Sequence, residues 1–151
     1  MNFWLIAGLL LLSYLLQCFF GLMQIKNFSK AFNPLRKKGK VAIGRFNGAF
    51  RAGAIVMFAI DDEGNIIEGK KMIGVTIFAK FKEIKGFDGK NIGIIKDEDI
   101  KNLSKPLREA IMDAKFNYNT IMSGGEIPPR LSFFQKIAKK FEKNSNKQVS
   151  L

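Results

Sequence analysis

The sequence contains no histidine and only one cysteine, and both absences restrict its chemistry. Histidine is the commonest general base near neutral pH and the commonest metal ligand in proteins. The single cysteine, Cys18, lies within an apolar segment and has no partner for a disulfide in the chain. We therefore expect no intrachain disulfide and no histidine-based metal or catalytic site.

Charge is also absent from the first 25 residues. Residues 3–25 are apolar on every helical face and would span about 35 Å, enough to cross a hydrocarbon core of about 30 Å. A cleaved signal peptide is disfavoured because no basic residue precedes the run and no small-x-small site follows it. A buried core helix is disfavoured because such helices are usually shorter and carry a polar stripe. Segment 1–25 is therefore predicted to be a single transmembrane anchor.

Basic residues follow the apolar run at once, with six Lys or Arg between residues 26 and 40. Lys and Arg accumulate on the cytoplasmic side of membrane proteins. The chain is therefore predicted to be a single-pass protein of the cell membrane, with its N-terminus outside and its C-terminal domain in the cytoplasm.

The distribution of charge predicts an anionic partner. Residues 1–60 carry eight basic and no acidic side chains, whereas residues 61–104 carry eight basic and nine acidic ones. Attraction to an anionic lipid bilayer contributes about 1 kcal/mol per basic residue near the surface. Because the first basic block lies directly after the anchor, lipid is the favoured partner. Phosphates of nucleic acid are the alternative, since Phe46 and Phe50 lie among the cations and aromatic rings stack on bases. The candidate contacts with lipid or nucleic acid are Lys26, Lys30, Arg36, Lys37, Lys38, Lys40, Arg45 and Arg51.

Beyond the anchor, apolar residues at spacings of three and four predict that the helix continues to Leu35, with a kink or restart at Pro34 and a stop at Gly39. Strand patterns then occur at 40–46, 52–60, 66–67, 71–80 and 92–95. The run at 52–60 is apolar throughout, as in a central strand buried on both faces. Turns are expected at Asn47-Gly48 and between residues 61 and 65. Segment 26–104 is therefore predicted to form a small, mostly antiparallel sheet of four or five strands.

The C-terminal third has helical patterns. Pro106 suits the first turn of a helix whose apolar stripe runs from Leu107 to Met122. A second, basic amphipathic helix is predicted over 131–143, suited either to packing or to an anionic membrane surface. These make a helical extension over 105–143, followed by a disordered tail at 144–151. The fold class is α+β.

No pattern in the chain predicts catalysis. The cluster Asp61-Asp62-Glu63 is followed by Gly64-Asn65 and is typical of a hairpin tip rather than a metal site. Gly44 and Gly48 do not belong to a phosphate loop, which needs Gly-Lys-Ser/Thr, and are better explained by turns and close strand packing. With no acid–base pair and no activated nucleophile, we expect no enzyme, no cofactor and no metal.

From the anchor to the last predicted strands, the chain resembles the glucitol operon activator family, also called GutM. The similarity covers roughly residues 10 to 100. The residues that carry it are Gln24-Ile25-x-x-Phe28, Phe32, Gly39-x-Val41-x-Ile43-Gly44-Arg45, Gly48-x-Phe50, Ala59-Ile60-Asp61, Gly64 and Gly74-x-Thr76-x-Phe78-Ala79.

The resemblance implies an accessory activator of genes for glucitol (sorbitol) uptake through the phosphotransferase system, with no catalytic residue. Such a protein would act by binding an operon regulator or a sugar transporter subunit, or by binding DNA directly. The alternative is a membrane-associated interaction or scaffold protein unrelated to transcription.

Overall fold

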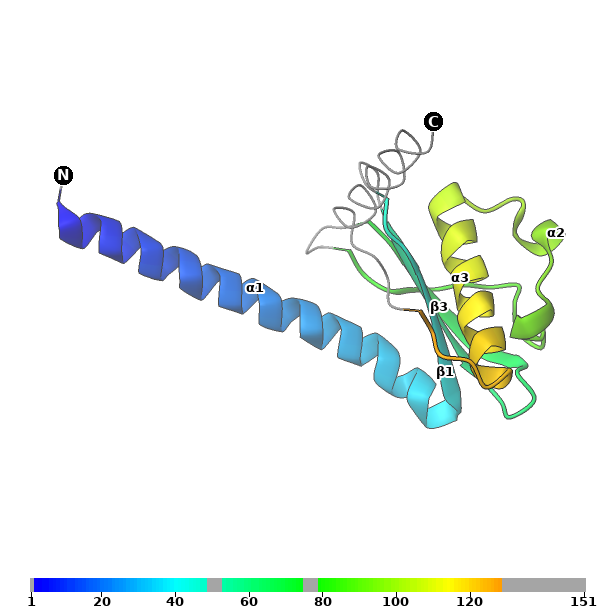
Figure 1. Cartoon of the computed structure of the whole chain (residues 1–151). Coiled ribbons are helices and arrows are strands. Elements are labelled where there is room, and N and C mark those ends of the chain that lie inside the picture. The colour runs from blue at the N-terminus through cyan, green and yellow to red at the C-terminus, as the bar shows by residue number, and fades with distance from the viewer. Residues whose placement is uncertain (1, 49–52, 75–78, 129–151) are drawn as a thin grey trace, which may run out of the picture. The chain divides into compact units, whose positions relative to one another are not determined.

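The computed structural model of the chain describes residues 2–48, 53–74 and 79–128 (Figure 1). The chain divides into two compact units, residues 1–119 and 120–151. The first unit holds the long N-terminal helix, a sheet and most of the last described helix. The account that follows concerns this first unit.

Helix α1, Phe3–Lys38, is continuous from the apolar run into the basic segment, and it continues through Pro34. It ends at Gly39, as predicted. Its buried residues are Ala31 and Leu35, and none of its 18-residue apolar window is buried. Among the described residues, α1 is the one helix long and apolar enough to cross a membrane.

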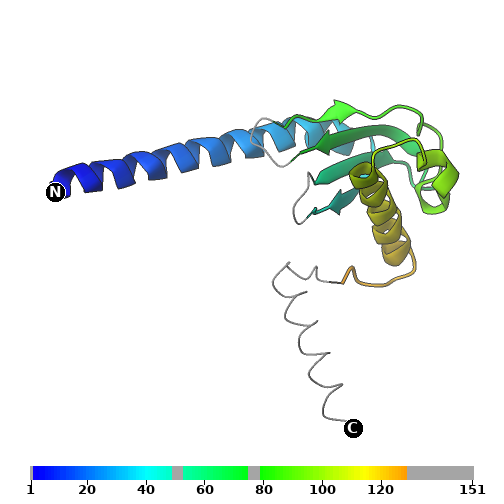
Figure 2. The ribbon, with the colours of Figure 1, turned by 90° about the horizontal axis from the view of Figure 1, so that it is seen from above.

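Four antiparallel strands follow, in the spatial order β1-β2-β3-β4 (Figure 2). Their bounds are Lys40–Phe46 for β1, Ala54–Ile60 for β2, Ile66–Ile73 for β3 and Lys82–Glu83 for β4. The predicted α+β class and the predicted small antiparallel sheet are confirmed. Strand β1 matches its predicted range at both ends.

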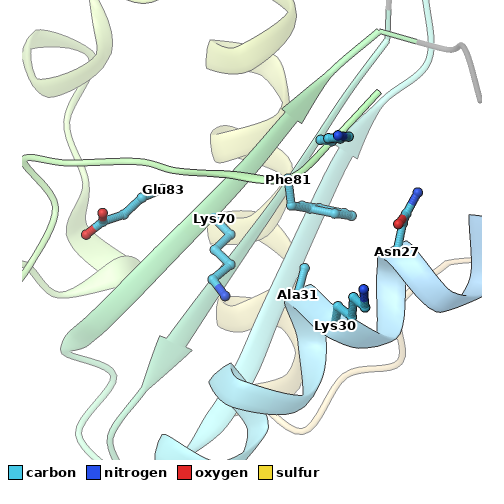
Figure 3. A pocket seen from close by; sticks show the side chains of 7 residues that line it. Asn27, Lys30, Ala31, Lys70, Phe81 and Glu83 are labelled. Atoms are coloured by element: carbon cyan, nitrogen blue, oxygen red, sulfur yellow. The ribbon is translucent and has the colours of Figure 1, made fainter. Parts of the chain in front are cut away.

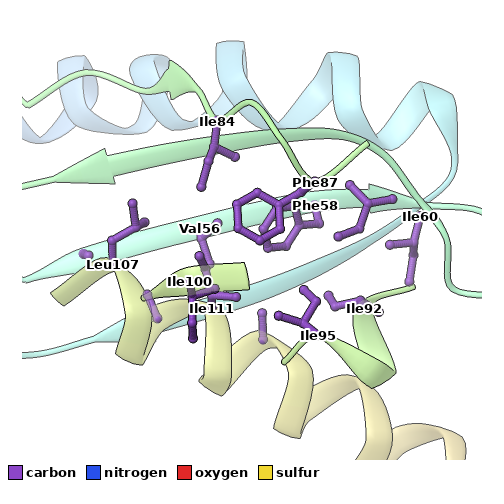
Figure 4. Close-up of a cluster of buried hydrophobic side chains, with 14 residues drawn as sticks. Val56, Phe58, Ile60, Ile84, Phe87, Ile92, Ile95, Ile100, Leu107 and Ile111 are labelled. Atoms are coloured by element: carbon purple, nitrogen blue, oxygen red, sulfur yellow. The ribbon is translucent and has the colours of Figure 1, made fainter. Parts of the chain in front are cut away.

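Strand β2 is central and buried on both faces, as its apolar run predicted. Alternate residues point to opposite faces of a strand, so Val56 and Phe58 contribute to one core and Met57 to another. The first core packs against helix α3, Lys105–Met122, through residues such as Leu107 and Ile111 (Figure 4). The second packs against α1. The sheet is therefore covered by one helix on each face.

Edge strand β1 lies unusually close to α3. A Cβ atom built on Gly44 would overlap the backbone atoms Ala110 O and Ala114 N, and would lie 2.7 Å from Ala114 Cβ. Two side chains of α3 also pair with the backbone of this edge: Arg45 N donates to Asp113 Oδ2 (2.9 Å), and Asn117 Nδ2 donates to Ile43 O (3.0 Å). Gly44 therefore serves close packing, as predicted, and α3 satisfies polar groups that an edge strand otherwise leaves unpaired.

One predicted strand is wrong, and two others belong to a single strand. The predicted strand at 92–95 is instead a 3-10 helix, η1 (Ile92–Ile94), followed by Ile95. Asn91 Oδ1 accepts a hydrogen bond from Gly93 N at its start, and the three-residue spacing buries both Ile92 and Ile95 while exposing Ile94. The segments 66–67 and 71–80 are not two strands. Strand β3 runs through the first and ends at Ile73, where Gly74 has φ +118°.

The described part of the chain includes two elements that were not predicted, strand β4 and the short helix α2 (Asp97–Ile100). Helix α3 was predicted, and its stripe is buried from Leu107 to Ala114, although Ile121 and Met122 are exposed. The predicted helix 131–143, the tail 144–151, and residues 75–78 of the predicted strand lie outside the described residues. The Asn47-Gly48 turn lies at the edge of the described range.

Candidate functional site

The basic segment of α1 presents its cations to solvent. Lys26, Lys30 and Lys37 are spaced by four and seven residues and therefore share one face of the helix. Leu35 is buried against the sheet and lies about half a turn away from Lys37. The fold thus leaves this row of lysines exposed to a partner, with Lys30 at the border of the second core beside Ala31.

The remaining predicted contacts have different surroundings. Lys38 forms an ion pair with Glu68 on β3, and Lys40 Nζ lies 3.0 Å from Asp62 Oδ1. The Lys40–Asp62 pair is exposed and contributes little stability, so it leaves Lys40 available for exchange with another anion, whereas Glu68 in the Lys38 pair is only 21% exposed. Arg36 Nη1 donates to Gly39 O at 3.4 Å.

Arg45 lies on β1, whereas the row of lysines lies on α1. The backbone N–H of Arg45 donates the hydrogen bond to Asp113 described above. Alternation along the strand places its side chain on the same face as Val41 and Ile43, which pack against the second core. Arg51 lies outside the described residues. Among the described cations, five therefore lie on α1, and Lys40 and Arg45 lie on β1.

A basic hollow that was not predicted lies between α1 and the β3–β4 edge (Figure 3). Its volume is about 330 Å³, and Lys30, Lys70 and Lys80 are among its lining residues. Lys80 also lines a second hollow of about 610 Å³, with Lys71 and Lys82. The sequence does contain the signal: residues 70–85 hold five lysines and one acidic residue, Glu83. This local excess of positive charge disappears in the total for residues 61–104, which is close to neutral.

Aromatic contacts fix α1 beside this hollow. The rings of Phe28 and Phe32 stack with centroids 5.6 Å apart, and the ring of Phe81 meets Phe28 edge-on at 6.1 Å. Aromatic pairs in these arrangements are worth about 0.5–1.5 kcal/mol beyond the area they bury. The segment before β4 is therefore attached to the same stretch of helix that carries Lys30.

The acidic cluster forms the β2–β3 turn, as predicted. Asp61 Oδ1 accepts from Glu63 N (3.0 Å) and from Asn65 N (2.8 Å), and Gly64 has φ +87°. These oxygens are used by the turn itself. Across the described ranges, no group of three His, Cys, Asp or Glu side chains is placed to hold a metal ion.

This turn makes the stability of the fold depend on pH. The side-chain amide and then the backbone N–H of Asn65 hold the pKa of Asp61 below its ordinary value of 3.8. A depressed pKa in the folded chain means that the stabilisation is present above pH 3.8 and is lost as the pH falls below it. We expect Asp61→Asn to lower stability at neutral pH and to weaken the decline in acid, as measured by urea unfolding at several pH values.

Asp62→Asn is the matched control, since it removes the same charge from the same turn. Asp62 is exposed and accepts none of the hydrogen bonds described for this turn. Part of the acid dependence should survive in Asp61→Asn, because the side chain of Lys90 and the backbone N–H of Lys96 also lower the pKa of Asp99. Identical pH profiles for wild type and Asp61→Asn would contradict the assignment.

Comparison with known proteins finds one family along most of this fold. The family model of the glucitol operon activator protein (GutM) matches residues 5–111. The glucitol operon activator protein of Escherichia coli (strain K12) is 34% identical over 80 residues, which are 53% of this chain and 67% of that protein. No solved structure matches the chain significantly. The matched region covers the apolar part of α1, all four strands and the start of α3.

Proposed function

Because this chain belongs to the glucitol operon activator (GutM) family, we propose that it is an accessory activator of a glucitol (sorbitol) uptake operon and acts while tethered to the cell membrane. The observation that carries this proposal is the family match, which spans α1 together with the sheet. The named relative supports the regulatory role. The proposed action is binding of a partner, without catalysis.

The tether is supported by the state of α1. Its large apolar side chains are exposed, including Trp4, Leu10 and Leu22 at 84%, 68% and 68%. An exposed apolar surface of this kind marks an interaction site with a protein or a membrane. A length of about 35 Å for residues 3–25 matches the hydrocarbon core. The excess of Lys and Arg after the run supports a cytoplasmic sheet domain.

The helix also limits which cations a bilayer can attract. At 1.5 Å per residue, Lys26 and Lys30 lie within about 8 Å of Ile25, the last residue of the apolar run. Lys37 lies about 18 Å from it. Attraction between exposed charges fades beyond a Debye length of about 8 Å at physiological salt. Lys26 and Lys30 are thus the proposed lipid contacts, and the later cations are available to another partner.

Indirect action on transcription is the preferred mechanism. A tethered domain meets a membrane-bound transporter subunit, or a regulator recruited there, within the same surface, whereas DNA must approach the bilayer. Direct DNA binding is the second candidate; it would use cations between Lys26 and Arg51, and its affinity would fall steeply with salt. The described cations of this stretch come from two elements, α1 and β1, and we take this to support a protein partner over DNA.

The test is transcript abundance of the glucitol uptake genes during growth on glucitol. We expect deletion of the gene to lower these transcripts and the full chain to restore them. A chain whose residues 3–25 are replaced by an unrelated apolar span should restore them too, whereas a chain lacking residues 1–25 should not. Unchanged transcripts in the deletion strain would contradict the activator role and favour a scaffold unrelated to transcription.

A further inference from the structure

We propose that the hollow between α1 and the β3–β4 edge is a binding site for a phosphate group, carried either by an anionic lipid headgroup or by a soluble phosphate monoester. The site is lined by Asn27, Lys30 and Ala31 of α1, Lys70 of β3, Lys80 and Phe81 before β4, and Glu83 of β4. This goes beyond the proposed function, because the site holds a ligand whatever operon the chain regulates.

The charges in the hollow are not balanced by the chain. The Lys70 side chain is only 20% exposed, and Lys70 Nζ lies 3.9 Å from Glu68 Oε1. The other oxygen of Glu68, Oε2, is taken by Lys38. The nearest counter-charge of Lys70 is therefore distant and shared with Lys38. A bound anion would supply a closer one.

The other lysines of the hollow add to this excess. Neither Lys30 nor Lys80 forms an ion pair with any residue in the described ranges. Glu83 is the one acidic residue among the described residues of the lining, and Figure 3 shows its carboxylate pointing away from Phe81 and from α1. The described lining therefore holds three lysines and one glutamate, whose carboxylate is turned aside.

The chemistry of the lining favours phosphate over other anionic ligands. Lysine binds phosphate as a point charge with three rotatable donors, and the Asn27 amide can add a further donor. A volume of about 330 Å³ is at the small end of ligand pockets, which suits a headgroup or a small monoester better than a nucleic acid strand. Ala31 and Phe81 supply an apolar wall for the carbon skeleton of such a ligand.

The hollow is also held in shape before a ligand arrives. The edge-on contact of Phe28 with Phe81 joins α1 to the segment that carries Lys80. Ala31 is 5% exposed and packs in the second core. The backbone of Lys70 is paired with that of Glu83 across β3 and β4, which holds these two lining residues next to each other. Groups fixed in this way lose little freedom on binding, and this raises affinity.

The experiment uses the full chain in neutral detergent and measures binding by titration calorimetry. The soluble probes are inorganic phosphate and glucose 6-phosphate. The lipid probes are short-chain phosphatidylglycerol, with phosphatidylcholine of the same chain length as its zwitterionic control. Lys70→Gln with Lys80→Gln is the test variant. Lys101→Gln with Lys105→Gln is the matched control, since both lysines are exposed and the net charge falls equally.

We expect saturable binding that the test variant weakens by about tenfold or more, because it loses two charged donors to the phosphate oxygens. The control variant should bind as the wild type does. Binding of the soluble probes identifies a monoester site. If phosphatidylglycerol binds more tightly than phosphatidylcholine and neither soluble probe binds, the site is a headgroup site. Either result supports the proposal.

Two results would overturn it: no saturable binding of any probe, or equal weakening in the test and control variants, which would show attraction to net charge alone. Far-ultraviolet circular dichroism checks that the test variant is folded. If it is not, Lys30→Gln replaces it, since Lys30 is exposed on α1 and supports no described packing. None of these outcomes depends on transcription, so the site and the proposed function can fail separately.

Discussion

Replacing Gly44 with alanine is expected to lower the free energy of unfolding by about 3 kcal/mol, the upper part of the usual range for overpacking a core. The added methyl group would overlap backbone atoms of Ala110 and Ala114, so α3 and β1 would have to separate. That separation would also stretch the hydrogen bond from Asn117 Nδ2 to Ile43 O. Urea unfolding of the chain in neutral detergent, followed by circular dichroism, measures the change.

Two further variants show whether the close approach is the cause. Gly21→Ala makes the same exchange where the new Cβ meets no atom within 4 Å, and in a helix it should not destabilise. Ala114→Gly should not rescue Gly44→Ala, because the overlap is with backbone as well as with the Ala114 side chain. An unaltered unfolding midpoint in Gly44→Ala would show that the two elements are farther apart than described.

Removal of residues 1–25 is expected to transfer the chain from the membrane fraction to the soluble fraction. The deletion takes away the exposed apolar part of α1, which is long and apolar enough to cross a membrane. A helix that spans a bilayer is held there effectively irreversibly. It leaves Ala31 and Leu35, which are the buried residues of α1, so the sheet keeps the helix that covers its second core. Membrane fractionation followed by immunoblotting measures the distribution.

The control for this deletion replaces residues 3–23 with an unrelated apolar sequence of equal length, which should keep the chain in membranes. Circular dichroism of the truncated chain tests that the sheet domain remains folded. A truncated chain that stays in the membrane fraction would contradict the role of α1. Membrane binding would then have to come from the predicted basic helix at 131–143.

The sequence predicted those elements whose signals are local. Strand β1 begins where Gly39 stops the helix, and it alternates cleanly as far as Phe46. Strand β2 was recognised as central because every residue from 54 to 60 is apolar. Helix α3 was predicted from Pro106 and from apolar residues at helical spacing. The GutM resemblance, drawn from short motifs along residues 10 to 100, is confirmed by the family match.

The features that were missed depend on contacts between distant parts of the chain. Ile92 and Ile95 look like strand residues until the core that receives both of them is known. Gly69 separates the two predicted pieces of β3, yet in the fold it is a place where Phe58 and Ile84 leave no room for a side chain. Likewise Lys30 and Lys70 are forty residues apart, and only the packing of α1 on the sheet makes them line one hollow.

The junction of α1 with the sheet has one further consequence. Gly39 alone separates the last residue of the helix from the first residue of β1, so no flexible linker lies between them. A membrane-spanning α1 would therefore fix the height of the domain above the lipid, and rotation of the helix about its axis would turn the whole sheet with it. A neighbour in the same bilayer would therefore meet the domain at one fixed height, and recognition would become a search in two dimensions in which the rotation of α1 selects the face that is presented.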